Sequence, residues 1–160
     1  DGSAPGLTLN ADALIRHADQ FSSWGNKILY TIHKEGHTTG YNFDTGIRFV
    51  KSSGYYPVFY LLISTNMGCL LYAPISMEDP EDRPFFAESL IPHDAVFVDA
   101  DHFVLLEKKR IHLFRIEAHD SPWLVHTMDF SANVISVMPT NEQKQYAVIE
   151  ENGRVSRHNY

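Results

Sequence analysis

The hydrophobic and polar positions of this chain form a repeated pattern of a short apolar run, a polar turn and a second apolar run. The three copies are Leu61 to Tyr72, Val104 to Phe114 and Ala147 to Arg157. Such a pattern predicts β-hairpins, because two short apolar runs on either side of turn residues pair and bury a shared face. Each hairpin can be aligned on the first residue of its second strand that is expected to point inward. These residues are Cys69, Ile111 and Val155, and they follow one another at intervals of 42 and 44 residues.

The most regular series of predicted strands lies beyond residue 94. Four strands are joined by short turns: Ala95 to Val98, His102 to Glu107, Arg110 to Glu117 and Trp123 to Phe130. Three more follow, at Val134 to Met138, Gln145 to Glu150 and Arg154 to Asn159. Four antiparallel strands with a repeat of roughly 40 to 45 residues are typical of one blade of a β-propeller.

The N-terminal third of the chain is less regular. We interpret residues 1–9 as a flexible linker or as residues left by the expression vector, and we expect the 160 residues to be part of a longer polypeptide. Asn10 is expected to cap a short helix whose apolar residues Leu14, Ala18 and Phe21 share one face. An irregular hairpin follows. The predicted organisation is therefore a linker at 1–9, a helix and hairpin at 10–57, and propeller-like β-repeats at 58–160.

The units between residues 58 and 160 resemble the repeats of WD40-like β-propellers. The Gly-His pair that opens many such blades is absent from these units. The Trp-Asp pair that usually closes the third strand is replaced by Leu71-Tyr72, Phe114-Arg115 and His158-Asn159. The resemblance implies an all-β, antiparallel fold of about three propeller-like blades in an incomplete ring. It also implies a rigid platform that binds other proteins without catalysis. Because at least about four blades are needed to close a ring, the alternative is a β-sandwich or a small barrel.

Composition and charge limit the classes of function. Hydrophobic residues make up 44% and charged residues 21% of the 160 residues, which is ordinary for a folded globular protein. The formal net charge of −7 disfavours a protein that binds the phosphate backbone of nucleic acids. Cys69 is the single cysteine, and apolar runs such as Val58 to Ile63 are too short to span a bilayer. We therefore expect an intracellular protein, cytoplasmic or nuclear, without membrane association.

The histidines offer one candidate for a metal-dependent site. His93 and Asp94 precede the predicted strand at 95–98, and Asp99, Asp101 and His102 follow it. A strand of this length separates its ends by more than ~10 Å, whereas zinc ligands lie within about 2.3 Å of the ion. The two groups are therefore not expected to share a metal, and Asp99 and Asp101 are interpreted as turn residues. We predict no metal, no cofactor and no catalytic residue.

Two segments are predicted to contact partner proteins. The first contains Tyr55 and Tyr56, because aromatic side chains with a polar tip are favoured at interaction hot spots. The second is an acidic loop followed by two phenylalanines, in which the charges would steer a basic partner and the rings would anchor it. Its candidate contact residues are Glu78, Asp79, Glu81, Asp82, Phe85 and Phe86.

These observations favour a non-catalytic protein–protein interaction module that belongs to a larger scaffold or multiprotein complex. Its partners would be other proteins that supply missing blades or pack on sheet edges. Two alternatives stay open at this point. One is an all-β domain that binds a small ligand, a carbohydrate or a peptide, and the other is a metal-dependent enzyme that uses the region of His93 and His102.

Overall fold

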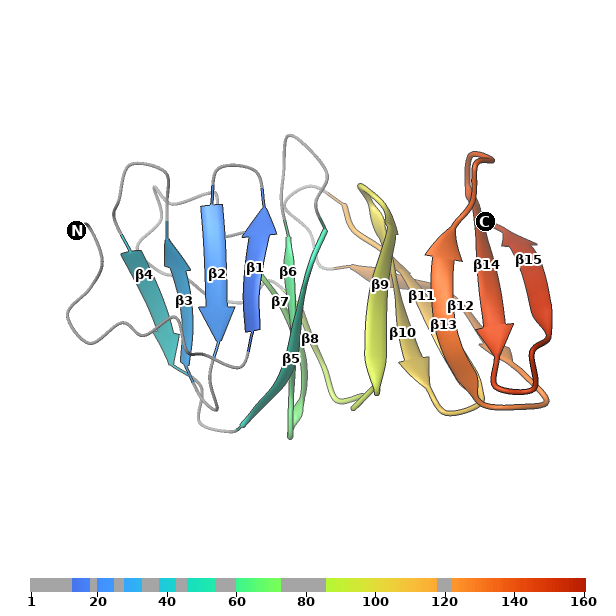
Figure 1. Cartoon of the computed structure of the whole chain (residues 1–160), viewed down its shortest axis with the longest axis horizontal. Coiled ribbons are helices and arrows are strands. Elements are labelled where there is room, and N and C mark those ends of the chain that lie inside the picture. The colour runs from blue at the N-terminus through green and yellow to red at the C-terminus, as the bar shows by residue number, and fades with distance from the viewer. Residues whose placement is uncertain are drawn as a thin grey trace. The chain divides into compact units, whose positions relative to one another are not determined.

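The computed structural model shows an all-β architecture (Figure 1). It describes residues 13–17, 20–24, 28–32, 38–42, 46–53, 60–72, 86–117 and 122–160, and it describes side chains from residue 46 onward, except those of 72, 86 and 87. All regular elements in these ranges are strands, which confirms the all-β part of the predicted fold. The chain divides into two compact units, Asp1–Leu90 and Ile91–Tyr160. Within the described ranges, no helix has the length and apolar character needed to cross a membrane.

The first sheet of the N-terminal unit is an antiparallel meander with the strand order β1-β2-β3-β4. Its strands are Ala13–His17 (β1), Gln20–Trp24 (β2), Ile28–Ile32 (β3) and Thr38–Asn42 (β4).

This sheet occupies the stretch where a helix was expected after Asn10. Residues 10–12, 18 and 19 lie outside the described residues, and the remainder is strand: Ala13 pairs with Trp24 and His17 with Gln20. Over so short a segment an apolar spacing of three and four residues fits a helix, but it does not exclude two short strands around a tight connection. Pairing with a third strand, between Phe21 and Ile32, then favours the sheet.

The second sheet of this unit has the order β5-β6-β7-β8. Its strands are Ile47–Ser52 (β5), Leu61–Thr65 (β6), Gly68–Tyr72 (β7) and Phe86–Glu88 (β8). The predicted hairpin turn lies between β6 and β7, where Thr65 pairs with Gly68. Gly68 has a φ of +139°, and a Cβ there would lie 2.2 Å from the backbone oxygen of Glu88, so this position requires glycine. Cys69 is buried as expected.

The C-terminal unit begins with a four-stranded meander of order β12-β11-β10-β9. Its strands are Asp94–Asp99 (β9), His102–Glu107 (β10), Arg110–Arg115 (β11) and Trp123–Asp129 (β12). The four strands predicted from the sequence in this region are confirmed. The turn between β9 and β10 is closed by Asp99, whose carboxylate accepts a 2.7 Å hydrogen bond from the Asp101 amide. This contact confirms the interpretation of Asp99 as a turn residue.

The last sheet has three described strands in the order β13-β14-β15. They are Val134–Pro139 (β13), Gln145–Glu150 (β14) and Val155–Asn159 (β15). The expectation that Val155 points inward is wrong, because its side chain is 60% exposed. The connection before β15 spans residues 151–154 and is longer than the two-residue turn of the β10–β11 hairpin, so the inward position moves to Ser156, which pairs with the buried Val148.

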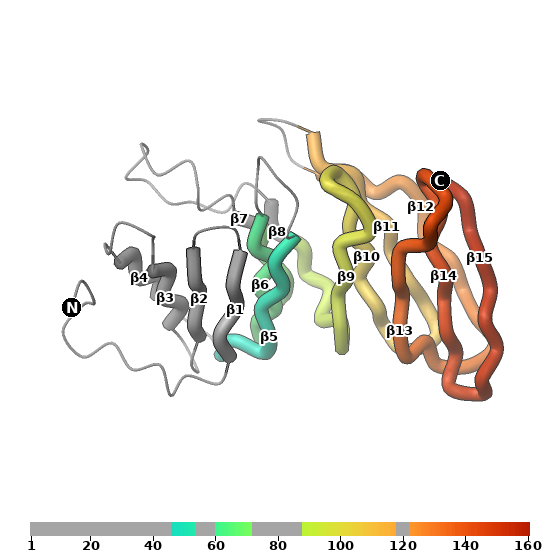
Figure 2. Tube along the Cα trace, turned by 45° about the horizontal axis from the view of Figure 1, so that its top comes forward, coloured from blue at the N-terminus to red at the C-terminus, as the bar shows by residue number. Residues whose placement is uncertain are grey.

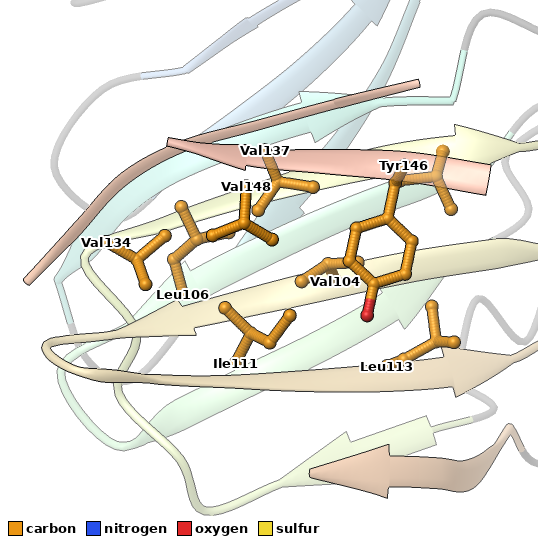
Figure 3. Packing of buried hydrophobic residues seen from close by; sticks show 9 residues of the cluster. Val104, Leu106, Ile111, Leu113, Val134, Val137, Tyr146 and Val148 are labelled. Atoms are coloured by element: carbon orange, nitrogen blue, oxygen red, sulfur yellow. The ribbon is translucent and has the colours of Figure 1, made fainter. Parts of the chain in front are cut away.

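A hydrophobic core joins the two sheets of the C-terminal unit (Figure 3). The sheet β9–β12 contributes Leu106, Ile111 and Leu113, and all three side chains are fully buried. The sheet β13–β15 places Tyr146 and Val148 against them, as the close-up shows. Face-to-face packing of the two sheets thus buries one face of β13–β15. The opposite face of β13–β15, here called the outer face, is the candidate surface.

Candidate interaction surface

Most residues of the two predicted contact segments lie outside the described residues. This applies to Tyr55, Tyr56, Glu78, Asp79, Glu81, Asp82 and Phe85. Phe86 is the first residue of β8, and its backbone pairs with Leu71. A surface must therefore be sought among the described residues of the C-terminal unit.

The histidine region is divided by β9, as the sequence predicted. His93 precedes this strand and its Nε2 lies 3.0 Å from the Val134 carbonyl oxygen. At the other end of the strand, His102 Nδ1 lies 2.9 Å from the Asp99 carboxylate. Within the described ranges, no three side chains of His, Cys, Asp or Glu gather closely enough to hold a metal ion.

The outer face of β13–β15 carries exposed apolar side chains in cross-strand rows. One row consists of Met138, Ala147 and Arg157, of which Ala147 is buried, and the next consists of Ser136, Ile149 and Val155, of which Ile149 is partly buried. Met138 is 45% exposed and Val155 is 60% exposed. Side chains that alternate along a strand point to opposite faces, so these residues share the face directed away from the core. The outer face therefore exposes the apolar side chains of Met138 and Val155 on its two flanking strands, with Arg157 beside them.

Ile135 adds to the exposed apolar residues of β13. The pairing of β13 with β14 shifts between Val134 and Ser136, which leaves Ile135 as the extra residue of a bulge. Its side chain is 54% exposed.

The free edge of the same sheet is formed by β15, which pairs only with β14 among the described strands (Figures 1 and 2). Backbone hydrogen bonds at both ends of the β14–β15 pairing show which residues of β15 direct their backbone groups toward β14. The Glu150 amide donates to the Arg154 carbonyl oxygen, and the Tyr160 amide donates to the Lys144 carbonyl oxygen. In an antiparallel pair, successive residues direct their backbone groups alternately toward and away from the partner strand. Consequently Val155 and the two residues at 157 and 159 direct their amide and carbonyl groups out of the sheet.

Aromatic and histidine side chains line the inner face near this edge. The Tyr146 ring is fully buried and lies 5.7 Å from the rings of both His158 and Tyr160, measured between centroids. A 2.8 Å hydrogen bond joins its hydroxyl to Nε2 of His126. Burial raises the pKa of Tyr146 to about 12, so this hydroxyl keeps its proton at neutral pH.

The histidines of this cluster are held in their neutral form. Burial lowers the pKa of His126. Burial also lowers the pKa of His158, and the nearby charge of protonated His126 lowers it further. His158 Nε2 lies 2.8 Å from the Ser156 hydroxyl.

A second polar contact ties the end of the chain to the four-stranded sheet. The Tyr160 hydroxyl donates a 2.6 Å hydrogen bond to Oδ2 of Asp99. Burial opposes ionisation of Asp99, but hydrogen bonds from His102, Tyr160 and the Asp101 amide outweigh it and lower the pKa to about 2. The carboxylate is thus charged at neutral pH and acts as an acceptor at the centre of this contact.

Sequence reasoning missed the outer face because it placed Val155 on the inner one. The alternation of Val155, Arg157 and Asn159 was visible in the sequence, but the length of the preceding connection decides which side faces the core. Comparison with known proteins adds no assignment: no family model matches the chain, and no curated protein matches it.

Proposed function

We propose that this chain is a non-catalytic protein–protein interaction module, built from propeller-like sheets and belonging to a larger scaffold. The observation that carries the proposal is the exposure of apolar side chains on the outer face of β13–β15, Met138 on β13 and Val155 on β15. Contiguous apolar residues exposed on a sheet are typical of surfaces that bind another protein.

The occupant we propose for this face is a sheet of a partner protein. The inner face of β13–β15 already packs against a sheet, through apolar residues that alternate along its strands. On the outer face, the alternating residues Met138 and Val155 are exposed and Ile149 is partly exposed. A second sheet packed there would bury these side chains in the same way, and each fully buried aliphatic side chain contributes about 1.5–3 kcal/mol.

The propeller-like arrangement is supported by the spacing of the hairpins. The β6–β7 and β10–β11 hairpins have fully buried residues, Cys69 and Ile111, at equivalent positions. Their sheets are antiparallel meanders of four strands. Consecutive four-stranded meanders at a constant interval are typical of blades.

The test compares two variants that introduce the same charge at two exposed methionines. Met138→Glu places a carboxylate on the outer face, whereas Met67→Glu places one at the tip of the β6–β7 hairpin, where the side chain is 75% exposed. Proteins retained by the immobilised chain are quantified by mass spectrometry for the wild type and for both variants. Light scattering on each variant monitors self-association.

We expect Met138→Glu to lose specific partners that Met67→Glu retains, since a buried carboxylate without a partner is strongly unfavourable. Equal retention by both variants would contradict the proposal. If the wild type forms concentration-dependent dimers and Met138→Glu abolishes them, the occupant of the outer face is a second copy of this chain and not a partner protein.

A further inference from the structure

The turn between β14 and β15 contains the one Asn-Gly pair of the sequence, Asn152-Gly153. Both residues are exposed. Gly153 has a φ of +87°, and a Cβ built there meets no heavy atom within 4 Å. Each of the other asparagines is followed by a residue that has a side chain. Asn152 is therefore the asparagine whose following backbone nitrogen is the least hindered.

A hydrogen bond holds the side chain of Asn152 over the backbone that follows it. The Arg154 amide donates to Oδ1 of Asn152 at 3.0 Å. A side-chain oxygen that accepts from the amide two residues later closes an Asx turn around the intervening peptide unit. The carbon Cγ of Asn152 is consequently kept close to the Gly153 nitrogen, and the bond to Oδ1 draws electrons away from that carbon. The turn thus places an electrophilic carbon beside a backbone nitrogen.

The Gly153 nitrogen is itself a hydrogen-bond donor at the tip of the hairpin. Its N–H donates to the Glu150 carbonyl oxygen, and the Glu150 amide donates to the Arg154 carbonyl oxygen, both at 2.9 Å. An amide nitrogen attacks a carbonyl carbon only after it has lost its proton, so the bond from Gly153 has to open first. Local opening at an exposed turn requires little free energy.

We propose that Asn152 is a modification site at which the side-chain amide is converted to a carboxylate through a cyclic imide. The site is independent of the proposed function. Hydroxide removes the Gly153 amide proton, and the nitrogen attacks Cγ of Asn152. The new N–Cγ bond forms and the Cγ–Nδ2 bond breaks. The side-chain nitrogen takes a proton from water and leaves as ammonia, which regenerates the hydroxide.

Water then opens the imide at either of its two carbonyl carbons. Attack at Cγ breaks the bond to the Gly153 nitrogen and leaves aspartate in an unchanged backbone. Attack at the main-chain carbonyl carbon of residue 152 breaks the original peptide bond and leaves a backbone that runs through Cγ, which is isoaspartate. Both products consume one water and release one ammonia.

The isoaspartate product would lengthen the connection that positions β15. It adds one methylene carbon to the main chain between Glu150 and Val155, whereas the two hydrogen bonds of the tip are formed by the shorter path. Its carboxylate also lies next to Glu151 and close to Glu150, whose side chain is only 1% exposed. Like charges repel more strongly where little water separates them. We therefore expect the modification to loosen the β14–β15 hairpin from its tip.

The test uses the full chain, incubated at mildly alkaline pH and sampled over time. Peptide masses after digestion give the converted fraction of each asparagine, and an isoaspartyl methyltransferase quantifies the isoaspartate. Conversion of Asn152 should be about tenfold faster than that of Asn141, which is equally exposed but is followed by Glu142. The rate should rise with hydroxide concentration. Equal rates at the two asparagines, or an amide that persists at Asn152, would overturn the proposal.

Three variants assign the reaction to this turn. Gly153→Ala adds a methyl group beside the attacking nitrogen and should slow conversion about tenfold. The methyl group hinders attack in the unfolded chain as well, so this comparison does not depend on the folding of the variant. Asn152→Gln should abolish isoaspartate formation, and the matched Asn141→Gln should leave it unchanged. Undiminished isoaspartate in Asn152→Gln would show that the reaction occurs elsewhere in the chain.

Asn152→Asp separates the added charge from the lengthened backbone. Hydrogen exchange of the Glu150 amide is measured by NMR in this variant, in the fresh wild type and in the isoaspartate fraction. We expect the fastest exchange in the isoaspartate fraction, because the variant carries the same charge on an unchanged backbone. Equal exchange in the isoaspartate fraction and in Asn152→Asp would contradict the proposed effect on the hairpin.

Discussion

The hydrogen bond between Tyr160 and Asp99 is expected to fasten the end of β15 to the four-stranded sheet. The Tyr160 hydroxyl lies 2.6 Å from Oδ2 of Asp99, and the Tyr160 ring lies 4.7 Å from the ring of His102, measured between centroids. Tyr160→Phe removes the hydroxyl and retains the ring. The substitution therefore tests the hydrogen bond separately from the packing.

The magnitude follows from the pKa of Asp99. Its decrease from 3.8 to about 2 corresponds to roughly 2.5 kcal/mol of preference for the charged carboxylate, at about 1.36 kcal/mol per pKa unit. The side chain is 35% exposed, so screening by water reduces this value to about 1 kcal/mol. His102 and the Asp101 amide share the stabilisation with Tyr160. We expect Tyr160→Phe to lower the free energy of unfolding of this unit by about 0.5 kcal/mol at pH 7.

The dependence on pH has a definite sign. The folded-state pKa of Asp99 is depressed, so its contribution is complete above pH 3.8 and is lost as the pH falls toward 2. The difference between the wild type and Tyr160→Phe should shrink over the same range. Native-state exchange of the Val148 amide, in the central strand β14, reports the stability of this unit.

A double-mutant cycle with Asp99→Asn isolates the pair from other effects of each substitution. A coupling energy below about 0.3 kcal/mol at pH 7, or a difference that does not change below pH 4, would refute the reasoning.

Three further predictions concern the core, the turns and the histidines. Leu106→Ala should lower the free energy of unfolding by about 2–5 kcal/mol in urea titrations, because Leu106 is fully buried between the two sheets. Gly68→Ala should cost more in the same assay than Gly153→Ala: both glycines have a positive φ, but a Cβ meets backbone only at Gly68. The free energy of unfolding should decrease as the pH falls below about 6.5, because His126 and His158 have lowered pKa values in the folded state and bind protons more readily in the unfolded state. His126→Gln should make this pH dependence weaker in thermal melts. An unchanged pH dependence would contradict the assignment.

The strands of the C-terminal unit were predictable because their pattern and turn chemistry agree. The predicted strand at His102 to Glu107 is observed with the same bounds, and the strand predicted from Arg110 ends two residues earlier than expected, at Arg115. Asp99 and Asp101 mark the preceding turn, and Lys108 has the positive φ of a tight connection. Local sequence was therefore sufficient where the turns are short.

The outer face and the free edge were not predictable from the same pattern. Alternation shows that Val155 and Arg157 share a face, but the connection at 151–154 determines which face meets the core. Likewise, no local sequence signal indicates the bulge at Ile135, because the bulge depends on how β13 pairs with β14. A free edge is a property of the whole sheet, and no single strand encodes it.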